Sequence, residues 1–271
     1  MNPLVSTDDL VCRFTSRRSS FLALDHVSMT VEQGTSLGVV GESGAGKTTL
    51  IRCLLGLQQP TEGTVTFDGS DIGTMSAKQR RAMRRRVGMV FQNPVMALNP
   101  RMTVEESVAE PLRLHTKLRG VDLRRRVGTA LESVGLAEAH RSRLPHQISG
   151  GQCQRVGIAR ALVTDPELVI LDEPTSALDV SVQAQILNLL TDLKAEHDLT
   201  FVMVSHSIDV VRYLSDRVVV MLQGRVVEEG LAGEVLTEPR HEYTRNLVAA
   251  SPTVESDSLR IALSSREEVV S

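Results

Sequence analysis

The stretch GESGAGKT, residues 41–48, decides more about the fold of this chain than any other. It fits the pattern GxxxxGK[ST], in which glycines allow backbone N–H groups to curl around a phosphate. The apolar run TSLGVV (35–40) precedes it, and the segment KTTLIRCLLGL (47–57), apolar on one face, follows it. A strand before the loop and a helix after it are the context that this motif requires. We therefore predict a phosphate-binding loop at the end of a buried strand.

Two residues of this loop have predicted roles of their own. Lys47 would reach the β and γ oxygens of a nucleoside triphosphate, and the Thr48 hydroxyl would ligate Mg²⁺. The residues predicted to contact the nucleotide here are Gly41, Glu42, Ser43, Gly44, Ala45, Gly46, Lys47, Thr48 and Thr49.

Polar residues end three further apolar strands. LVILDE (168–173) delivers Asp172, a predicted Mg²⁺ ligand, and Glu173, which would accept a proton from the water that attacks the γ-phosphate. Such an acid is often a helix cap, but a phosphate loop in the same chain favours the catalytic interpretation. Gln92 ends VGMVFQ and His206 ends TFVMVSH. An amide there can orient water and Mg²⁺, and an imidazole can donate to a phosphate oxygen.

The stretch ISGGQ (148–152) begins another predicted helix, QCQRVGIARALV. The first N–H groups of a helix attract anions, yet no lysine lies near Ser149. The chain thus has a second helix start of the phosphate-binding kind. A pass along the chain also predicts an α/β core, residues 1–92 and 166–238, interrupted by a helical subdomain, residues 93–165. Residues 239–271 are a C-terminal extension. Within it, SPTVESDSLRIALSSREEVVS (251–271) has no convincing periodicity and is predicted to be a loosely ordered tail.

Six motifs, GESGAGKT, FQ, ISGGQ, LVILDE, SALD and SH, resemble in order and spacing the nucleotide-binding subunit of ABC transporters. The resemblance covers about Val11 to Gly230. It implies an α/β fold, a P-loop NTPase core of ABC type with an antiparallel β subdomain and an inserted α-helical subdomain, and an ATPase that uses ATP and Mg²⁺. Gln92 would then be the Q-loop residue and a metal ligand, and His206 the switch histidine.

The same resemblance implies what the stretch ISGGQ binds. In this family two cassettes meet head to tail, so that the signature of one caps the γ-phosphate held by Lys47 of the other. The signature residues would be Ser149, Gly150, Gly151 and Gln152, and the D-loop SALD would add Asp179 to the nucleotide contacts.

Such proteins stack an aromatic residue of an early strand on adenine. Phe14 is our choice for that position, with Phe21 as its rival. Phe67, Phe91 and Phe201 are expected to be core residues, and Tyr213 and Tyr243 come too late in the chain.

A narrower resemblance, to the oligopeptide, dipeptide and nickel importer branch, rests on NPRMT (99–103) and HEYTR (241–245). It implies uptake of peptides or a related small solute. The implied partners are a second ABC ATPase subunit, copy or paralogue, two transmembrane permease subunits and an extracytoplasmic solute-binding protein. The implied location is peripheral, at the cytoplasmic face of the cell membrane. The sequence leaves the transported substrate open.

An alternative is a soluble ABC ATPase that acts on nucleic acid or ribosomes. The net charge of −3 argues against nucleic acid as a partner, and the basic runs at 78–86 and 124–126 are interpreted as solvated helix faces. The interval from Thr48 to Ser149 also lacks the coiled-coil or zinc insertions of such proteins. A cassette that binds without hydrolysing is disfavoured because Glu173 and His206 are both present. Three scattered cysteines and the absence of a long apolar run predict a cytosolic chain with reduced thiols.

Overall fold

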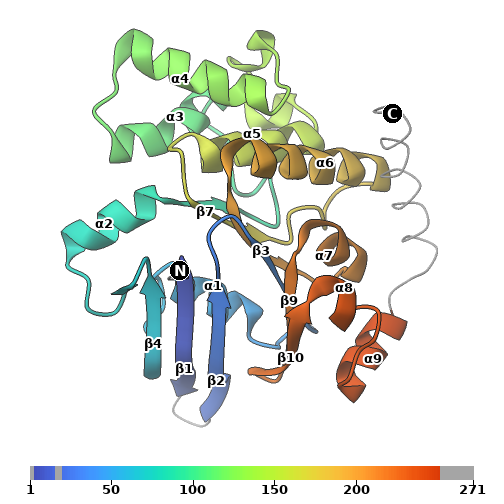
Figure 1. The fold of residues 1–271 in the computed structure, drawn as a ribbon. Coiled ribbons are helices and arrows are strands. Elements are labelled where there is room, and N and C mark those ends of the chain that lie inside the picture. The colour runs from blue at the N-terminus through green and yellow to red at the C-terminus, as the bar shows by residue number, and fades with distance from the viewer. Residues whose placement is uncertain (1–2, 16–19, 251–271) are drawn as a thin grey trace. The chain divides into compact units, whose positions relative to one another are not determined.

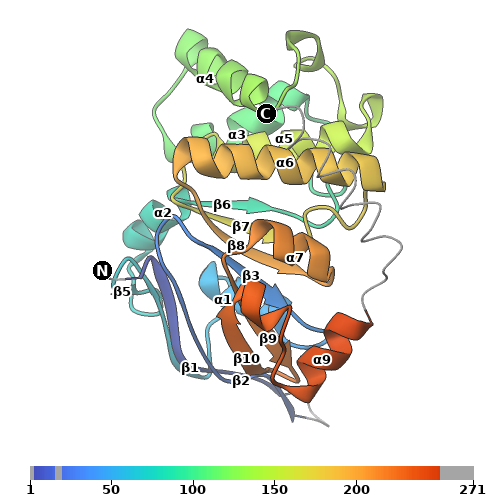
Figure 2. The same cartoon turned by 45° about the vertical axis from the view of Figure 1, so that its right-hand side comes forward.

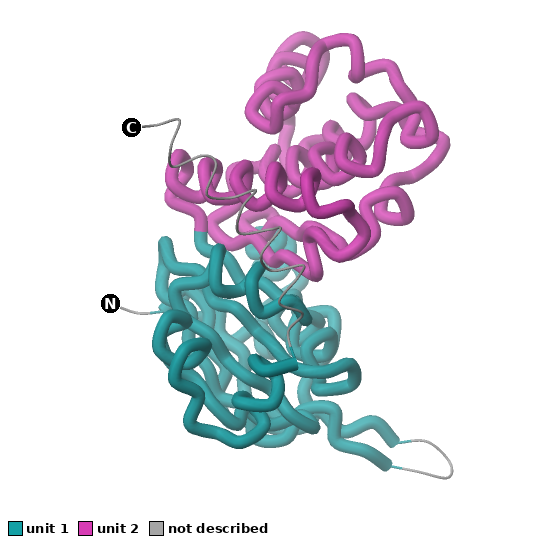
Figure 3. The backbone as a smooth tube through the Cα atoms, turned by 90° about the vertical axis from the view of Figure 1, so that its right-hand side faces the viewer, with its two compact units in different colours: residues 1–84, 200–251 teal, residues 85–199, 252–271 magenta. Residues whose placement is uncertain are grey.

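The computed structural model describes residues 3–15 and 20–250. These residues fall into two compact units, the first from residues 3–15, 20–84 and 200–250 and the second from residues 85–199 (Figure 3). The division of the chain into a core, a helical subdomain and an extension stays a prediction.

An antiparallel sheet forms one part of unit 1, in the order β2-β1-β4-β5 (Figure 1). Its strands are β1 (Val5–Thr15), β2 (Ser20–Val31), β4 (Glu62–Phe67) and β5 (Ser70–Asp71). Along β2, Val27, Met29 and Val31 are buried while the residues between them are exposed. This alternation is typical of a sheet with one solvated face.

Parallel strands form the second part of unit 1. Strand β3 (Ser36–Val40) lies between β8 (Thr200–Ser205) and β9 (Arg217–Leu222), parallel to both. Every residue of β3 and β8 is buried, which explains why both read as continuous apolar runs. Strand β10 (Arg225–Leu231) pairs antiparallel with β9 across the turn at Gln223-Gly224. The helices of this unit are α1 (Lys47–Leu54), most of α2 (Ala77–Arg85), α7 (Ile208–Leu214), α8 (Ala232–Val235) and α9 (Glu242–Ala249).

Unit 2 joins two parallel strands to a group of helices (Figure 2). Strand β6 (Val87–Val90) pairs with β7 (Leu168–Asp172). Helices α3 (Val104–His115), α4 (Gly120–Ser133) and α5 (Gly150–Leu162) pack against one another, and α6 (Val180–His197) contacts α5. Two 3₁₀ turns, Glu138–His140 and Pro145–Gln147, precede α5. Inside this unit Arg141 binds the carboxylates of Glu105 and Glu138 at 3.1 and 2.9 Å.

Most predicted elements are present, but one expectation was wrong and one helix was not predicted. Phe91, expected in the core, is 42% exposed because β6 ends at Val90, and its ring lies 5.7 Å from the Arg160 guanidinium. Helix α9 was not predicted, since its eight residues are mostly polar. The loosely ordered tail falls, from residue 251 onward, outside the described residues. In the described part of the chain, no helix is long and apolar enough to cross a membrane.

Candidate nucleotide-binding site

The loop of residues 41–46 connects β3 to α1, as the sequence predicts. Gly46 precedes α1 with φ at 101°, a conformation that side chains disfavour. A Cβ atom at Gly46 would lie 2.3 Å from the carbonyl oxygen of Ala23 in β2, so only glycine fits there. The β9–β10 turn holds the loop as well, because Gly224 N donates to Ala45 O at 3.1 Å. The loop is thus held by close packing on β2 and by a hydrogen bond from the β9–β10 turn.

Lys47 places its ammonium group inside this loop. Its side chain is 9% exposed, and Nζ donates to the carbonyl oxygens of Gly41 and Glu42 at 2.6 and 2.8 Å. The first turn of α1 contains no acidic residue. The ammonium charge and the positive end of the helix dipole therefore add together, which makes this a site for an anion.

Tyr243, set aside on sequence as too late in the chain, reaches this loop. Its hydroxyl oxygen accepts a hydrogen bond from the backbone N–H of Glu42 at 2.9 Å. Burial raises the pKa of Tyr243, with a smaller opposing effect of the Glu42 hydrogen bond. Tyr243 and Glu42 are 201 residues apart, and hydrophobic periodicity does not predict contacts at that distance in sequence. The motif HEYTR was the one sequence feature that marked Tyr243.

Phe14 and Phe21 form a pair across the β1–β2 hairpin. They are cross-strand partners, and their rings stack with centroids 5.5 Å apart and planes at 22°. Phe14 is half-buried and Phe21 is 61% exposed. Both are aromatic surfaces in unit 1, and the choice of Phe14 for adenine stays a prediction.

His206 is the remaining predicted site residue in unit 1. It follows β8 directly and is exposed, while the neighbouring Ser205 hydroxyl accepts from Ser207 N at 3.0 Å. The imidazole therefore stands at the carboxyl end of a buried parallel strand, where ligands of α/β sheets bind.

In unit 2 the structure brings Gln92 and Glu173 together. The Gln92 amide Nε2 donates to the Glu173 carboxylate Oε2 at 2.6 Å. Glu173 has a positive φ of 46°, unusual for a residue with a side chain, and Asp172 ends β7 just before it. Strain of this kind persists where surrounding structure enforces it. The backbone next to Glu173 is held by Gln154, a residue that the sequence analysis missed. Gln154 is 1% exposed, and its amide donates to Pro174 O at 2.6 Å.

The signature begins α5 in a reciprocal cap. Ser149 Oγ accepts from Gln152 N at 3.2 Å, and Gln152 Oε1 accepts from Ser149 N at 2.9 Å. Gln152 Nε2 also lies 3.0 Å from His140 Nε2. A Cβ atom at Gly151 would meet Val182 Cγ1 of α6 at 2.7 Å. Close packing of α5 on α6 thus requires a residue without a side chain in the signature.

Asp179 has a structural role at the start of α6. Its carboxylate accepts from Val182 N at 3.0 Å and from the Ser181 hydroxyl at 2.8 Å. The backbone bond from Val182, then the bond from Ser181, lowers the pKa of Asp179. The D-loop aspartate is therefore held ionised and capping a helix within its own chain.

A buried strand, a glycine loop that encloses a buried lysine, and a helix that begins at that lysine define a nucleotide-binding protein of the phosphate-loop class. The family model "ABC transporter" matches residues 24–176. The chain belongs to the ABC transporter family, and its predicted fold class and its assignment to the ATPases of that family are confirmed.

Relatives and solved structures agree with this assignment. The oligopeptide transport ATP-binding protein OppF of Salmonella typhimurium is 48% identical, over 87% of this chain and 71% of that protein. The di/tripeptide transport ATP-binding protein DppF of Pseudomonas aeruginosa is 43% identical, over 95% of this chain and 81% of that protein.

Among solved structures, a dimeric ATP-binding cassette in a post-hydrolysis state, bound to ADP and phosphate, has a TM-score of 0.77. It is 32% identical and covers 84% of this chain and 98% of its own. CbiO1 of Clostridium perfringens, part of an ABC transporter complex, has a TM-score of 0.78 at 31% identity, over 94% of this chain and 98% of its own.

Proposed function

We propose that this chain is the ATP-hydrolysing subunit of an ABC importer that takes up peptides or a related small solute. The observation that carries ATP binding is the buried Lys47 ammonium, enclosed by the carbonyl groups of its own glycine loop. Support for the cargo class comes from the relatives named above, which are oligopeptide and di/tripeptide transport proteins. Neither of those names refers to nucleic acid or ribosomes.

In the proposed site the loop holds the triphosphate. The N–H groups at the start of α1 would bind phosphate oxygens, since the first turn of a helix has no internal partners for them. Lys47 would keep its bond to Gly41 O and turn its other N–H groups, one of which donates to Glu42 O, toward β and γ oxygens. Thr48 and Thr49 would follow as hydroxyl donors or ligands in the same turn.

The residues proposed for Mg²⁺ are chemically suited to it. Thr48, Asp172 and Gln92 offer a hydroxyl, a carboxylate and an amide oxygen, the hard donors that Mg²⁺ prefers. Within the described residues no group of three His, Cys, Asp or Glu side chains could hold a metal ion by itself. Few protein ligands are expected when nucleotide phosphates complete the coordination. The bound ion would supply positive charge to the phosphate oxygens.

Hydrolysis is assigned to Glu173. Its carboxylate would take the proton from the attacking water, and Gln92, which donates to one carboxylate oxygen, would leave the other to accept that proton. His206 would donate to a γ-phosphate oxygen and so stabilise the charge that develops there.

The proposed active unit is a head-to-tail pair of cassettes. Ser149, Gly150, Gly151 and Gln152 of one cassette would cap the γ-phosphate held by Lys47 of the other, with Asp179 beside them. The dimeric cassette among the similar structures supports this arrangement. Two permease subunits and an extracytoplasmic solute-binding protein would complete the importer, with this chain peripheral at the cytoplasmic face of the membrane.

Copurification tests this proposal. The tagged chain, extracted from membranes with mild detergent, should bring down two membrane-spanning proteins and a second cassette. In proteoliposomes the assembled complex should hydrolyse ATP faster when a peptide-loaded binding protein is added. Recovery of ribosomes or nucleic acid, in place of membrane-spanning proteins, would favour the alternative function.

A further inference from the structure

Helix α9 contacts the phosphate loop through an aromatic side chain. Tyr243 lies in the first turn of α9, and its hydroxyl oxygen accepts a hydrogen bond from the backbone N–H of Glu42 at 2.9 Å. Both residues belong to unit 1. The contact joins the C-terminal extension to the second residue of the motif that binds phosphate.

The peptide unit between Gly41 and Glu42 is bonded at both ends. Its carbonyl oxygen, on Gly41, accepts from Lys47 Nζ at 2.6 Å, and its N–H, on Glu42, donates to Tyr243 at 2.9 Å. A peptide is planar, so fixing its N–H also fixes the direction of its carbonyl. Hydrogen bonds in such a chain also polarise one another. The tyrosine hydroxyl and the lysine ammonium are thus coupled through one peptide plane.

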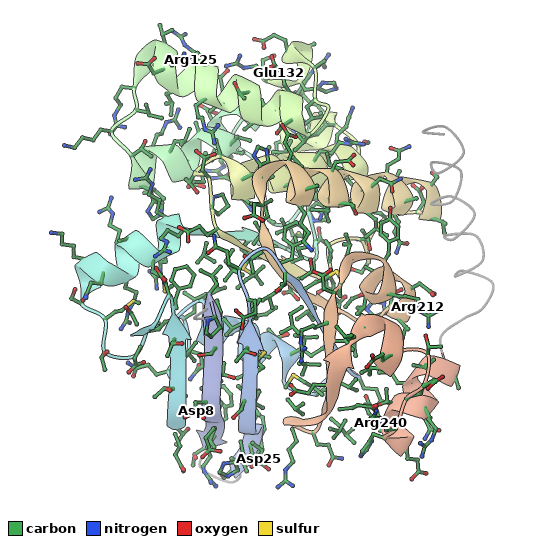
Figure 4. The ribbon with its side chains drawn as sticks, viewed as in Figure 1. Asp8, Asp25, Arg125, Glu132, Arg212 and Arg240 are labelled. Atoms are coloured by element: carbon green, nitrogen blue, oxygen red, sulfur yellow. The ribbon has the colours of Figure 1, made fainter. Side chains whose placement is uncertain are left out.

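Tyr243 is itself held in place from β10. The Glu228 carboxylate accepts from Arg240 N at 2.8 Å and from His241 N at 3.0 Å. His241 Nδ1 then accepts from Tyr243 N at 3.1 Å and caps α9. Figure 4 labels Arg240 where the chain enters this helix.

These bonds do not involve the Tyr243 hydroxyl, and Thr244, next in the helix, is fully buried. The hydroxyl can therefore be removed while α9 keeps its anchors.

We propose that Tyr243 is a positioning residue of the nucleotide site, which orients the Gly41–Glu42 peptide and through it the Lys47 ammonium. The inference rests on the proposed role of the loop in binding ATP. Tyr243 touches neither the phosphates nor the water in this scheme, so it acts on the affinity for nucleotide and not on the chemical step. The C-terminal extension thereby contributes to the ATP affinity of the cassette.

The test is Tyr243→Phe, which keeps the ring and removes the hydroxyl. Because one hydrogen bond is lost, we expect the dissociation constant of ATP and the KM to rise about threefold to tenfold, with kcat changed by less than about twofold. Amide hydrogen exchange across residues 38–46 should become faster, because the Glu42 N–H loses its partner. Tyr213→Phe removes the hydroxyl of the other tyrosine of the chain, on α7, and should leave all these quantities unchanged.

Each result has a distinct meaning. Wild-type protein that fails to bind ATP overturns the proposed function, whereas wild-type binding with an unchanged constant in Tyr243→Phe overturns this inference alone. A purely structural role would lower the unfolding midpoint without changing the KM, and that result would also contradict a positioning role.

Glu228→Ala gives a second test of the same inference. It loosens α9 at its entry and should raise the KM in the same direction, and an unchanged KM with measurably faster exchange in α9 would count against the inference.

Discussion

The amide of Gln92 donates a 2.6 Å hydrogen bond to the carboxylate of Glu173. The two residues occupy equivalent places just beyond the ends of neighbouring parallel strands. Val90 of β6 is in register with Leu171 of β7, and each site residue lies two positions further on. The pairing of β6 with β7 therefore brings together an amide and a carboxylate that are 81 residues apart in sequence.

Replacing Glu173 by Gln should slow ATP hydrolysis about a hundredfold or more, because the variant has no carboxylate to accept the proton of the attacking water. ATP binding should persist, since the side chain keeps its size and its place after β7. Phosphate release in single-turnover assays measures the first effect and calorimetry the second. Glu132→Gln, on the exposed face of α4 (Figure 4), is the control and should hydrolyse ATP at the wild-type rate. Turnover of Glu173→Gln at the wild-type rate would contradict the assignment.

Lys47→Ala should abolish tight nucleotide binding, because the variant loses the ammonium charge inside the loop. Calorimetric titration with ATP measures the loss. Lys78→Ala removes a lysine from the exposed face of α2 and should bind ATP as the wild type does. An unchanged ATP affinity in Lys47→Ala would be incompatible with a phosphate-binding loop.

Phe14→Ala should weaken ATP binding by about fivefold to tenfold, a value at the lower end of what stacking of a base on an aromatic ring contributes. The variant Phe21→Ala tests the rival within the same stacked pair, and it should weaken binding less. Titration with inorganic triphosphate beside ATP shows whether the lost affinity comes from the base, because the affinity for triphosphate should then stay unchanged. A larger effect of Phe21→Ala would assign the stacking position to Phe21, whose ring is the more exposed.

The sequence predicts local features of this site well and distant contacts poorly. The loop, its strand and its helix follow from a contiguous motif, and the cap at Ser149 follows from residues three positions apart. Tyr243 could not be placed, because one hydroxyl–amide bond across 201 residues leaves no trace in hydrophobic periodicity. Phe91 was misplaced because an apolar residue at a strand end reads as core until the last paired residue is known.

Unit 2 contains two helix caps of the same kind, and only one of them is proposed to contact a second cassette. Comparing variants of the two caps therefore distinguishes an effect on stability from an effect on that contact. Thr103 at the start of α3 and Ser149 at the start of α5 both form capping boxes, with side-chain oxygens 3.2 Å from the N–H three residues on. Thr103→Ala and Ser149→Ala should therefore each lower the free energy of unfolding by about 1 kcal/mol. Only Ser149→Ala should also slow ATP hydrolysis, because only the signature serine is proposed to reach the γ-phosphate of the partner.

The two variants are compared by urea unfolding and by ATPase rate at several protein concentrations. The ATPase activity of the wild type per molecule should rise with protein concentration as cassettes pair. A third variant, Ser149→Arg, should still bind ATP but lose most of that activity. Equal loss of ATPase in Thr103→Ala and Ser149→Ala would reduce the role of the signature to helix stability. A wild-type rate per molecule that stays constant down to a strictly monomeric preparation would show that the signature of a second cassette is not required.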